Sequence, residues 1–440
     1  MINMHKNKET TTLIRYFFIY SSLLLPALIP QPFNDVTRFL LYCTIPLFGL
    51  YVLAYSIHNK EYPIINTASI SFFLYSIFSI IILFPHHEFF RFGLAAITAL
   101  IIITISYIPR NLNEIKKEIM SISLYFTIFA IVIALISFLL LILHKYYPPI
   151  KNWTINNRPF VFSRNDVLIQ GHRLFGYGRH PNYTGMISGA GVISALIVFI
   201  KSQKTRDIIL SIVCIILNCA ILVMASSRTS ILMICSFVFI LVILYLPYKN
   251  KNKQETNRLT LIIFAGVLVF SIVVILCLCS DSAKNIVLNQ ILRSDNIKTA
   301  TGRTILQKTS INKYLESNNI LTGLSRTAIQ QITQSDGATH NTYIDILVST
   351  GLINFIFYSC GIVFSLIYCL RMLLNYKKYS SDDYLLLCIV IGLFVSSLIE
   401  NMFEARILYS LGPVPSIEYW KNCLPAVLYF ALKKAYASNM

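Results

Sequence analysis

The chain has 440 residues, of which 56% are hydrophobic and only 13% are charged, and its mean hydropathy is +0.65. Soluble globular domains carry about 25% charged residues, so a soluble enzyme or soluble binding module is excluded. The composition instead predicts an all-α protein that crosses the membrane several times. The formal net charge of +18 must then lie mainly in the loops.

Apolar stretches of about 17–25 residues, long enough to cross a bilayer as helices, recur along the whole chain. They lie near residues 12–31, 37–57, 63–84, 89–108, 121–144, 184–200, 207–224, 230–247, 259–279, 342–368, 383–400 and 417–433. No small-residue cleavage site follows the first stretch, so we interpret it as a helix rather than a signal peptide. We predict one integral-membrane domain over residues 1–440 with about twelve transmembrane helices.

Lysine and arginine in the short loops set the predicted orientation, because they are enriched on the cytoplasmic side. With the N-terminus in the cytoplasm, every inner loop is basic. The inner basic residues are Arg110, Lys116, Lys117, Lys201, Lys204, Arg206, Lys249, Lys251, Lys253, Arg258, Arg371, Lys377, Lys378, Lys433 and Lys434. Both termini are then cytoplasmic, and residues 145–182 and 280–341 face outward. A short amphipathic helix is expected within the second outer stretch, over residues 301–315.

The two outer stretches are basic although the positive-inside rule does not require it. Together they contain thirteen lysines and arginines against five acidic residues. This excess predicts an anionic ligand at the outer membrane surface. A lipid-linked pyrophosphate, a phosphorylated glycolipid and anionic lipid headgroups all fit that description.

Several arginines lie in turns or glycine-containing loops. Arg228 occupies a turn of a few residues between two apolar spans, and Arg303 follows Gly302 in an outer loop. Arg173 and Arg179 flank a glycine-rich turn. Guanidinium groups bind phosphate oxygens bidentately, so several converging arginines would form a pyrophosphate site without a metal. The alternative for each arginine alone is a side chain that snorkels to headgroups or is solvated.

His340 lies just before the apolar run that begins at Thr342, so it is predicted at the N-terminal end of a helix. The helix dipole and the unpaired N–H groups disfavour a positive charge there. We therefore expect a neutral imidazole that can accept a proton. A helix-capping or interfacial histidine is the alternative. No metal site is expected, because the outer stretches contain no His-x-His, Glu-x-x-His or Cys/His set.

These elements together resemble the O-antigen ligase and polymerase superfamily of bacterial inner membranes. His340-Asn341, nine residues and then Gly351 are similar to its His-Asn-x9-Gly signature. The segment from Arg228 to Leu232 is similar to its short Arg-x3-Leu element. The resemblance covers about residues 170–410.

Two further positions bear on the resemblance. Gly302-Arg303 followed by Gly323 is similar to the loop arginine and downstream glycine of the family. Asn354 departs from the ligase pattern, which has Gly, Thr or Tyr at that place. Ligase and polymerase therefore both stay open, although twelve spans and the signature spacing favour a ligase.

The resemblance implies a GT-C-like glycosyltransferase with periplasmic loops over residues 145–182 and, between helices 9 and 10, residues 280–341. The donor would be a glycan on undecaprenyl diphosphate. The acceptor would be a sugar hydroxyl of lipid A-core in an O-antigen ligase, or a lipid-linked repeat unit in a polymerase. The resemblance implies no metal and no other cofactor, and no nucleic-acid partner is expected. The enzyme would act in lipopolysaccharide biosynthesis, at the periplasmic face of the cell inner membrane.

The resemblance also assigns roles to residues. The diphosphate-binding candidates are Arg228, Arg303, Arg173 and Arg179. His340 would be the general base that activates the acceptor hydroxyl. The acceptor-site candidates are Asn341, Glu404 and Arg406. Glu400 and Asn401 lie with the last two at the outer end of the eleventh span, where an interfacial charge cluster is the alternative.

A twelve-helix transporter or lipid flippase is the rival from another class. Such proteins have repeats, broken helices and ionisable residues near the bilayer midplane. The predicted spans contain almost no charge at their centres, and the polar residues collect outside them. This distribution favours a transferase.

Overall fold

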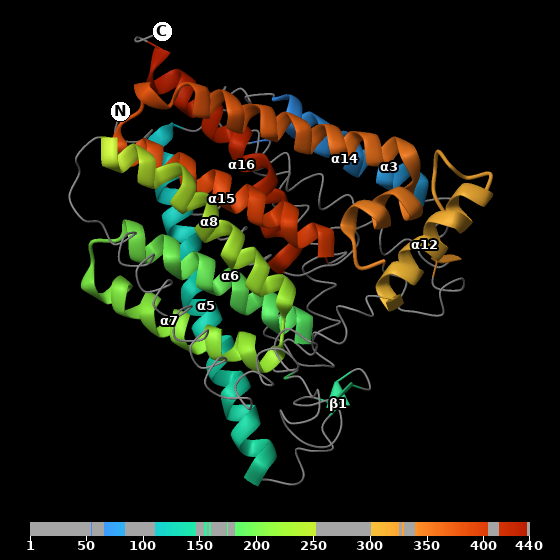
Figure 1. The fold of residues 1–440 in the computed structure, drawn as a ribbon, viewed down its shortest axis with the longest axis horizontal. Helices are drawn as coiled ribbons and strands as arrows, with labels where there is room; N and C mark the ends of the chain where they lie inside the picture. The colour runs from blue at the N-terminus through green and yellow to red at the C-terminus, as the bar shows by residue number, and fades with distance from the viewer. Residues whose placement is uncertain are drawn as a thin grey trace. The chain divides into compact units, whose positions relative to one another are not determined.

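A computed structural model describes residues 54, 66–83, 111–146, 154–155, 158–159, 174, 181–251, 301–324, 328–329, 339–403 and 413–437. This part of the chain consists mainly of helices and their connecting turns, with one pair of short strands, β1 (Thr154–Ile155) and β2 (Arg158–Pro159), which pair antiparallel. Figure 1 shows its elements in chain order from blue to red. The chain divides into two compact units, the first formed by Met1–Lys116 with Gly302–Met440 and the second by Lys117–Thr301.

Six of the described helices are long and apolar enough to cross a membrane, judged by length and composition. They are α5 (Leu112–Tyr146), α6 (Pro181–Lys201), α7 (Thr205–Ala225), α8 (Arg228–Lys251), α14 (Thr342–Leu374) and α15 (Ser381–Phe403). The remaining helices are α3 (Thr67–Leu83), α12 (Thr301–Glu316), the 3-10 helix η3 (Tyr376–Lys378) and α16 (Pro413–Ala435). The described residues are thus those of an all-α, multi-pass membrane protein.

Eight of the predicted spans coincide with helices, which are α3, α5, α6, α7, α8, α14, α15 and α16. The predicted start of α5 is wrong, because the helix begins at Leu112 rather than near residue 121. Lys116 and Lys117 therefore lie in a helix and not in a loop. The predicted spans 12–31, 89–108 and 259–279, and span 37–57 apart from Ala54, lie outside the described residues.

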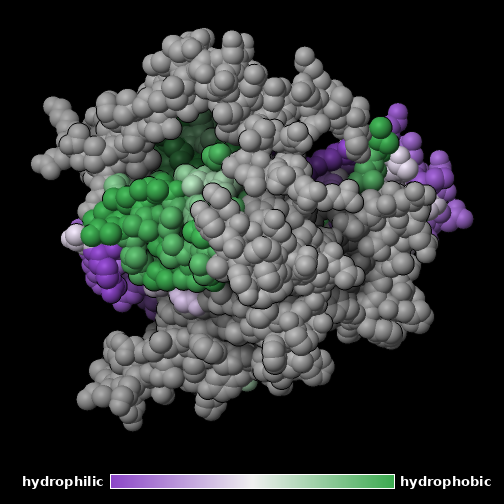
Figure 2. Space-filling model, turned by 90° about the horizontal axis from the view of Figure 1, so that it is seen from below, coloured by the Kyte–Doolittle hydropathy of each residue, from purple (hydrophilic) through white to green (hydrophobic). Residues whose placement is uncertain are grey.

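The surface pattern of α7 is the reverse of that in a soluble helix. Its buried side includes Asp207, Ser211 and Asn218. Its outer side includes Ile209, Ile212, Val213 and Ile216, each at least 40% exposed. A bilayer explains this pattern, because hydrocarbon accepts apolar side chains while the polar ones pack inside the protein. Figure 2 shows hydrophobic side chains gathered on an exposed face of the molecule.

In the first unit, α14 packs along α3, as Figure 1 shows, and against α15 and α16. The buried ring of Tyr358 lies between Phe72 and Tyr75, at centroid distances of 5.7 and 5.3 Å. Asn354 is fully buried and donates from Nδ2 to Ser79 Oγ at 3.0 Å. The residue that departs from the ligase pattern therefore contributes to helix packing.

In the second unit, small residues let α6 approach its neighbours closely. Gly185 and Gly189 face α8, and a Cβ added at Gly185 would overlap the side chain of Ser227. Gly191 faces Ala130 of α5 in the same way. Small residues at helix contacts allow this close approach in membrane proteins.

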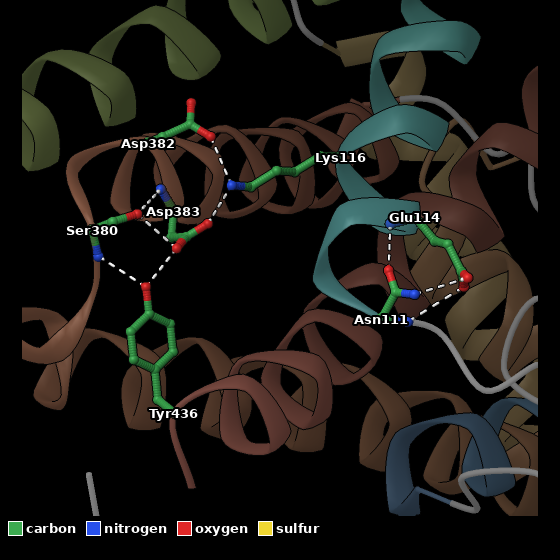
Figure 3. A network of polar contacts seen from close by, with 7 residues as sticks. All are labelled: Asn111, Glu114, Lys116, Ser380, Asp382, Asp383 and Tyr436. Atoms are coloured by element: carbon green, nitrogen blue, oxygen red, sulfur yellow. Dashed lines mark hydrogen bonds and ion pairs between the residues drawn. The ribbon is translucent and has the colours of Figure 1, made fainter. Parts of the chain in front are cut away.

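A cluster of ion pairs and hydrogen bonds surrounds the N-terminal end of α15 (Figure 3). Lys116 Nζ lies 2.7 Å from Asp382 Oδ2 and 2.6 Å from Asp383 Oδ1. Asp383 Oδ2 also accepts from Ser380 Oγ at 2.6 Å and from Tyr436 OH at 2.5 Å. The helix dipole favours acidic residues such as Asp382 and Asp383 in a first helical turn. Because their partners come from α5 and from the end of α16, the cluster links these two elements to the first turn of α15.

Candidate active site at the start of α14

A tight turn at residues 339–341 leads into α14 and carries His340. The backbone φ of His340 is +55°, in the left-handed region that residues other than glycine rarely adopt, so neighbouring contacts must hold the turn. Thr339 is fully buried and donates its N–H to Asp345 Oδ1 at 3.1 Å and its hydroxyl to Asn341 O at 3.0 Å. The half-buried His340 is thus fixed at the start of a helix.

Asn341 is the N-cap of α14. Its Oδ1 accepts from the backbone N–H groups of Tyr343 at 3.0 Å and Ile344 at 3.1 Å. These bonds satisfy two of the N–H groups that a helix start leaves unpaired. Its Nδ2 donates to Met402 O, at the C-terminal end of α15, at 3.0 Å. Both ends of the amide are therefore engaged, and Asn341 ties the turn to α15.

α12 approaches the same turn with two polar side chains one helical turn apart. Gln307 Nε2 donates to Thr339 O at 3.1 Å. Arg303 Nη1 donates to Phe403 O at 3.1 Å. Arg303 thus binds the carbonyl of Phe403, and Asn341 binds the carbonyl of the preceding residue, Met402. The structure therefore brings Arg303 beside the histidine turn, and it confirms the helix predicted over residues 301–315.

A break in α14 fixes the far end of its first segment. Gly351 interrupts the helix with φ +82° and ψ 178°, a conformation that is essentially restricted to glycine. The backbone around Gly323, whose φ is +79°, enters the break, and Leu352 N donates to Ile320 O at 2.9 Å. A Cβ on either glycine would lie 2.6 Å from the backbone nitrogen of the other. The two glycines that carry the family resemblance thus cross at van der Waals contact.

A small apolar core joins α12 to the first segment of α14. Tyr314, Ile329 and Val348 form its buried centre. Leu324 N donates to Val348 O at 2.8 Å, and Tyr314 OH donates to Ile320 O at 2.5 Å. Burial raises the pKa of Tyr314, which favours the protonated hydroxyl that donates this bond.

Residues near the C-terminal end of α15 form hydrogen bonds to the first residues of α14, directly after the His340 turn. Glu400 and Asn401 are only 3% and 1% exposed, so their side chains lie inside the protein. Asn401 Oδ1 accepts from Thr342 Oγ1 at 3.1 Å, and Tyr343 OH donates to Leu398 O at 3.3 Å. Sequence reasoning did not identify these supports, because each joins residues that are far apart in the chain.

Arg228 lies in the second unit, as the exposed first residue of α8. α7 ends at Ala225, and Ser226 follows in the left-handed conformation with φ +47°. Ser227 Oγ and Ser230 Oγ are hydrogen-bonded at 2.8 Å. The predicted short turn is confirmed, and it places Arg228 at a helix start that has no acidic residue in its first turn.

The other predicted site residues, Arg173, Arg179, Glu404 and Arg406, lie outside the described residues. Leu174 is described: it is 2% exposed and donates its N–H to Met224 O at 3.0 Å, near the end of α7. Among the residues that the structure describes, no group of three or more His, Cys, Asp or Glu side chains is placed to hold a metal ion.

Fold and site together define a multi-pass membrane protein with a histidine and an arginine positioned at a helix start. Residues 212–359, about a third of the chain, match the family model described as O-antigen ligase. The matched region contains Arg228, Arg303, His340 and both crossing glycines. No curated protein matches the chain. The family match confirms the resemblance of this chain to the O-antigen ligase and polymerase superfamily.

Proposed function

We propose that the protein is an O-antigen ligase, a membrane glycosyltransferase that moves O-antigen glycan from undecaprenyl diphosphate to a sugar hydroxyl of lipid A-core. One observation carries the proposal: Arg303 and the turn of His340 are anchored on successive carbonyls of α15. Transfer from a diphosphate needs a proton acceptor for the attacking hydroxyl and positive charge for the leaving group. The family match supports the same class of enzyme.

In the proposed reaction, His340 accepts the proton of the acceptor hydroxyl through a ring nitrogen. The hydroxyl oxygen forms a bond to the anomeric carbon, and the bond from that carbon to the diphosphate oxygen breaks. The electron pair leaves with undecaprenyl diphosphate, and Arg303 stabilises the charge that develops on it. Attack from the face opposite the leaving group would invert the anomeric centre, so base and cation must lie on different sides of the sugar. No metal is required in this scheme.

The remaining arginines are proposed as further diphosphate ligands. Arg228 has the best support among them, because it is exposed at a helix start. A helix start favours anions. Arg173 and Arg179 are proposed on the resemblance alone. A double-mutant cycle between Arg228 and Arg303 tests whether both act on one diphosphate, because groups that share a ligand give non-additive losses of rate.

The acceptor site is proposed to lie near the end of α15, with Glu404 and Arg406 as candidate ligands. Asn341 receives a different role from the one first predicted. Its amide oxygen caps α14 and its amide nitrogen binds Met402 O, so we assign it to positioning the histidine turn rather than to binding the acceptor.

An O-antigen polymerase is the alternative, in which the acceptor is a second lipid-linked repeat unit. Asn354 raised this alternative in the sequence. Its full burial and its bond to Ser79 fit a role in packing α14 on α3, and they favour neither acceptor. For either enzyme we propose a location in the bacterial inner membrane, with a periplasmic site and both termini in the cytoplasm.

The test is complementation of a strain that lacks the gene, read on a lipopolysaccharide gel. The wild-type chain should restore capped O-antigen, His340→Ala should not, and Lys313→Ala should, because Lys313 is an exposed residue of α12. Loss of all capped core with accumulation of lipid-linked polymer identifies a ligase. Core that bears a single repeat identifies the polymerase. A His340→Ala chain that inserts normally and restores capping would exclude His340 as the base.

A further inference from the structure

Three large apolar side chains are exposed where the α12–α14 connection enters the break in α14. Ile320, Leu321 and Leu352 are 40%, 57% and 37% exposed, and we name them the apolar apex. Single exposed leucines are ordinary on protein surfaces, but this group lies on two segments that are joined by a backbone hydrogen bond. We propose that the apolar apex is a membrane-contact surface, which inserts into the hydrocarbon edge of the leaflet nearest the His340 turn.

The backbone beneath the apolar apex is held rigidly. Ile320 O accepts from both Leu352 N and Tyr314 OH, and the crossing of Gly323 with Gly351 locks the chain directly after it. A loosely held loop could rotate its apolar side chains inward and away from water. Here the fixed backbone keeps them outward, so their exposure is a property of the fold.

The apolar apex continues a stripe on α14. The exposed apolar residues after Leu352 are Ile356, Val363, Leu366 and Leu370, at 49%, 52%, 44% and 51% exposure. Their spacing places them along one side of the helix. Because α14 is long and apolar enough to span a membrane, this side faces lipid. The apolar apex extends the lipid-facing side beyond the helix onto the neighbouring chain segment.

The length of α14 places the apolar apex at the edge of the hydrocarbon. Residues 352–374 form the segment after the break, about 34 Å long at the α-helical rise of about 1.5 Å per residue. The hydrocarbon core of a bilayer is about 30 Å thick. This segment alone can span it, so the break lies near a boundary. The first segment of α14 and the His340 turn then lie on the headgroup side of that boundary.

This depth bears on the proposed function, on which the following step rests. The diphosphate of a lipid-linked donor lies among the headgroups, while its polyprenyl chain lies in the hydrocarbon. An apolar apex anchored at the boundary holds α12, and with it Arg303, at the level of that diphosphate. The membrane contact itself does not depend on the reaction catalysed.

The test places a tryptophan at Leu321 or, as a matched control, at Asn318, an exposed polar residue three positions earlier. Each full-length variant is reconstituted in vesicles of phosphatidylcholine or of its brominated analogue, which quenches tryptophan in hydrocarbon. Emission from the native Trp153 and Trp420, measured on the parent protein, is subtracted. Leu321→Trp should lose most of its added emission in brominated vesicles, and Asn318→Trp should keep most of it.

Two outcomes overturn the proposal. Quenching of Leu321→Trp by aqueous acrylamide to the extent seen for Asn318→Trp would place the apolar apex in water. Shielding from both bromine and acrylamide would mean that a protein surface, such as a second copy, covers it. Neither readout requires transferase activity, so failure of the proposed reaction and failure of the membrane contact are separable.

Discussion

The two ends of α15 both gather polar groups, but they use them differently. At the N-terminal end, Asp382 and Asp383 pair with Lys116, and Asp383 also accepts from Ser380 and Tyr436. Opposite charges meet within one cluster, and Asp383 is 5% exposed. Helix capping and charge pairing explain this arrangement without any ligand.

At the C-terminal end, the last carbonyls of α15 accept from Asn341 and Arg303. Those donors come from other elements, and Asn341 directly follows His340, whose backbone is in the left-handed conformation. The polar groups there stabilise a strained turn, and strained backbone concentrates at functional sites. The comparison shows that the ion-pair cluster at the N-terminal end of α15 serves to join helices. The hydrogen bonds at the C-terminal end instead mark the candidate active site.

The sharpest way to test this distinction is Arg303→Ala. We expect the initial rate of glycan transfer to fall by about 10²–10³-fold, the typical cost of losing one group that stabilises developing negative charge. Arg303→Lys should retain part of the rate, because an ammonium keeps the charge but not the bidentate fork. Lys313→Ala is the control, since its surface pair with Glu316 contributes little. If Arg303→Ala instead lowers the unfolding temperature and leaves the transfer rate unchanged, Arg303 only caps the end of α15 and takes no part in the reaction.

At the N-terminal end of α15, a substitution should lower stability and leave the transfer rate unchanged. Lys116→Met leaves Asp383 buried without its ammonium partner, and we expect a loss of about 3 kcal/mol in the free energy of unfolding. The rate of transfer per folded molecule should stay the same. Lys117→Met, at the exposed neighbouring position, should change neither quantity. The unfolding midpoint in detergent and the specific activity separate the two effects, and a lost rate at full stability would contradict a structural role.

Gly351→Ala should weaken the support of the histidine turn. The new Cβ would collide with the backbone at Leu321 and Gly323, and the backbone conformation alone costs about 1–3 kcal/mol for a residue other than glycine. In Gly361→Ala, in the same helix, the new Cβ meets only side-chain atoms of the Phe72 ring and no backbone among its nearest atoms. We expect both variants to be less stable, but only Gly351→Ala to lower kcat. Equal kcat values in the two folded variants would argue against positioning by the glycine crossing.

Asn341 offers the smallest and most selective test. Asn341→Ala removes the cap and should cost about 1 kcal/mol, whereas Asn341→Asp keeps an acceptor for Tyr343 N and Ile344 N and loses the donor to Met402 O. We expect Asn341→Asp to retain most of the stability but to lose transfer rate. Thermal unfolding and initial rates, measured on the same samples, test this. Full activity of Asn341→Asp would show that the link to α15 is dispensable.

Patterns with a local cause could be predicted from the sequence. The length of the apolar runs predicts α6, α7 and α14. The sequence also predicts the turn before Arg228 and the helix over residues 301–315. The start of α5 was missed, because its first turns are polar. Asn111 and Glu114 cap them by exchanging hydrogen bonds, with Glu114 N donating to Asn111 Oδ1 at 2.8 Å. A hydropathy scan cannot detect such a start.

Within the candidate site, the resemblance indicated His340, Arg303 and the glycines at positions 323 and 351. It did not indicate that the two glycines cross, or that Arg303 binds a carbonyl a hundred residues later in the chain. Such contacts depend on tertiary packing, which no local periodicity encodes. Gly351 within an apolar run resembles a tolerated helical glycine, and only its φ of +82° shows the break.

The crossing of Gly323 with Gly351 has a consequence for biosynthesis. Residues 320–324 leave the ribosome before the segment that receives them, so they cannot take their final place until α14 has been made and inserted. The strained turn at His340, which depends on the same packing, must therefore assemble late, after the following helix has entered the bilayer. A nascent chain that stops before α14 is complete would therefore lack the assembled His340 turn.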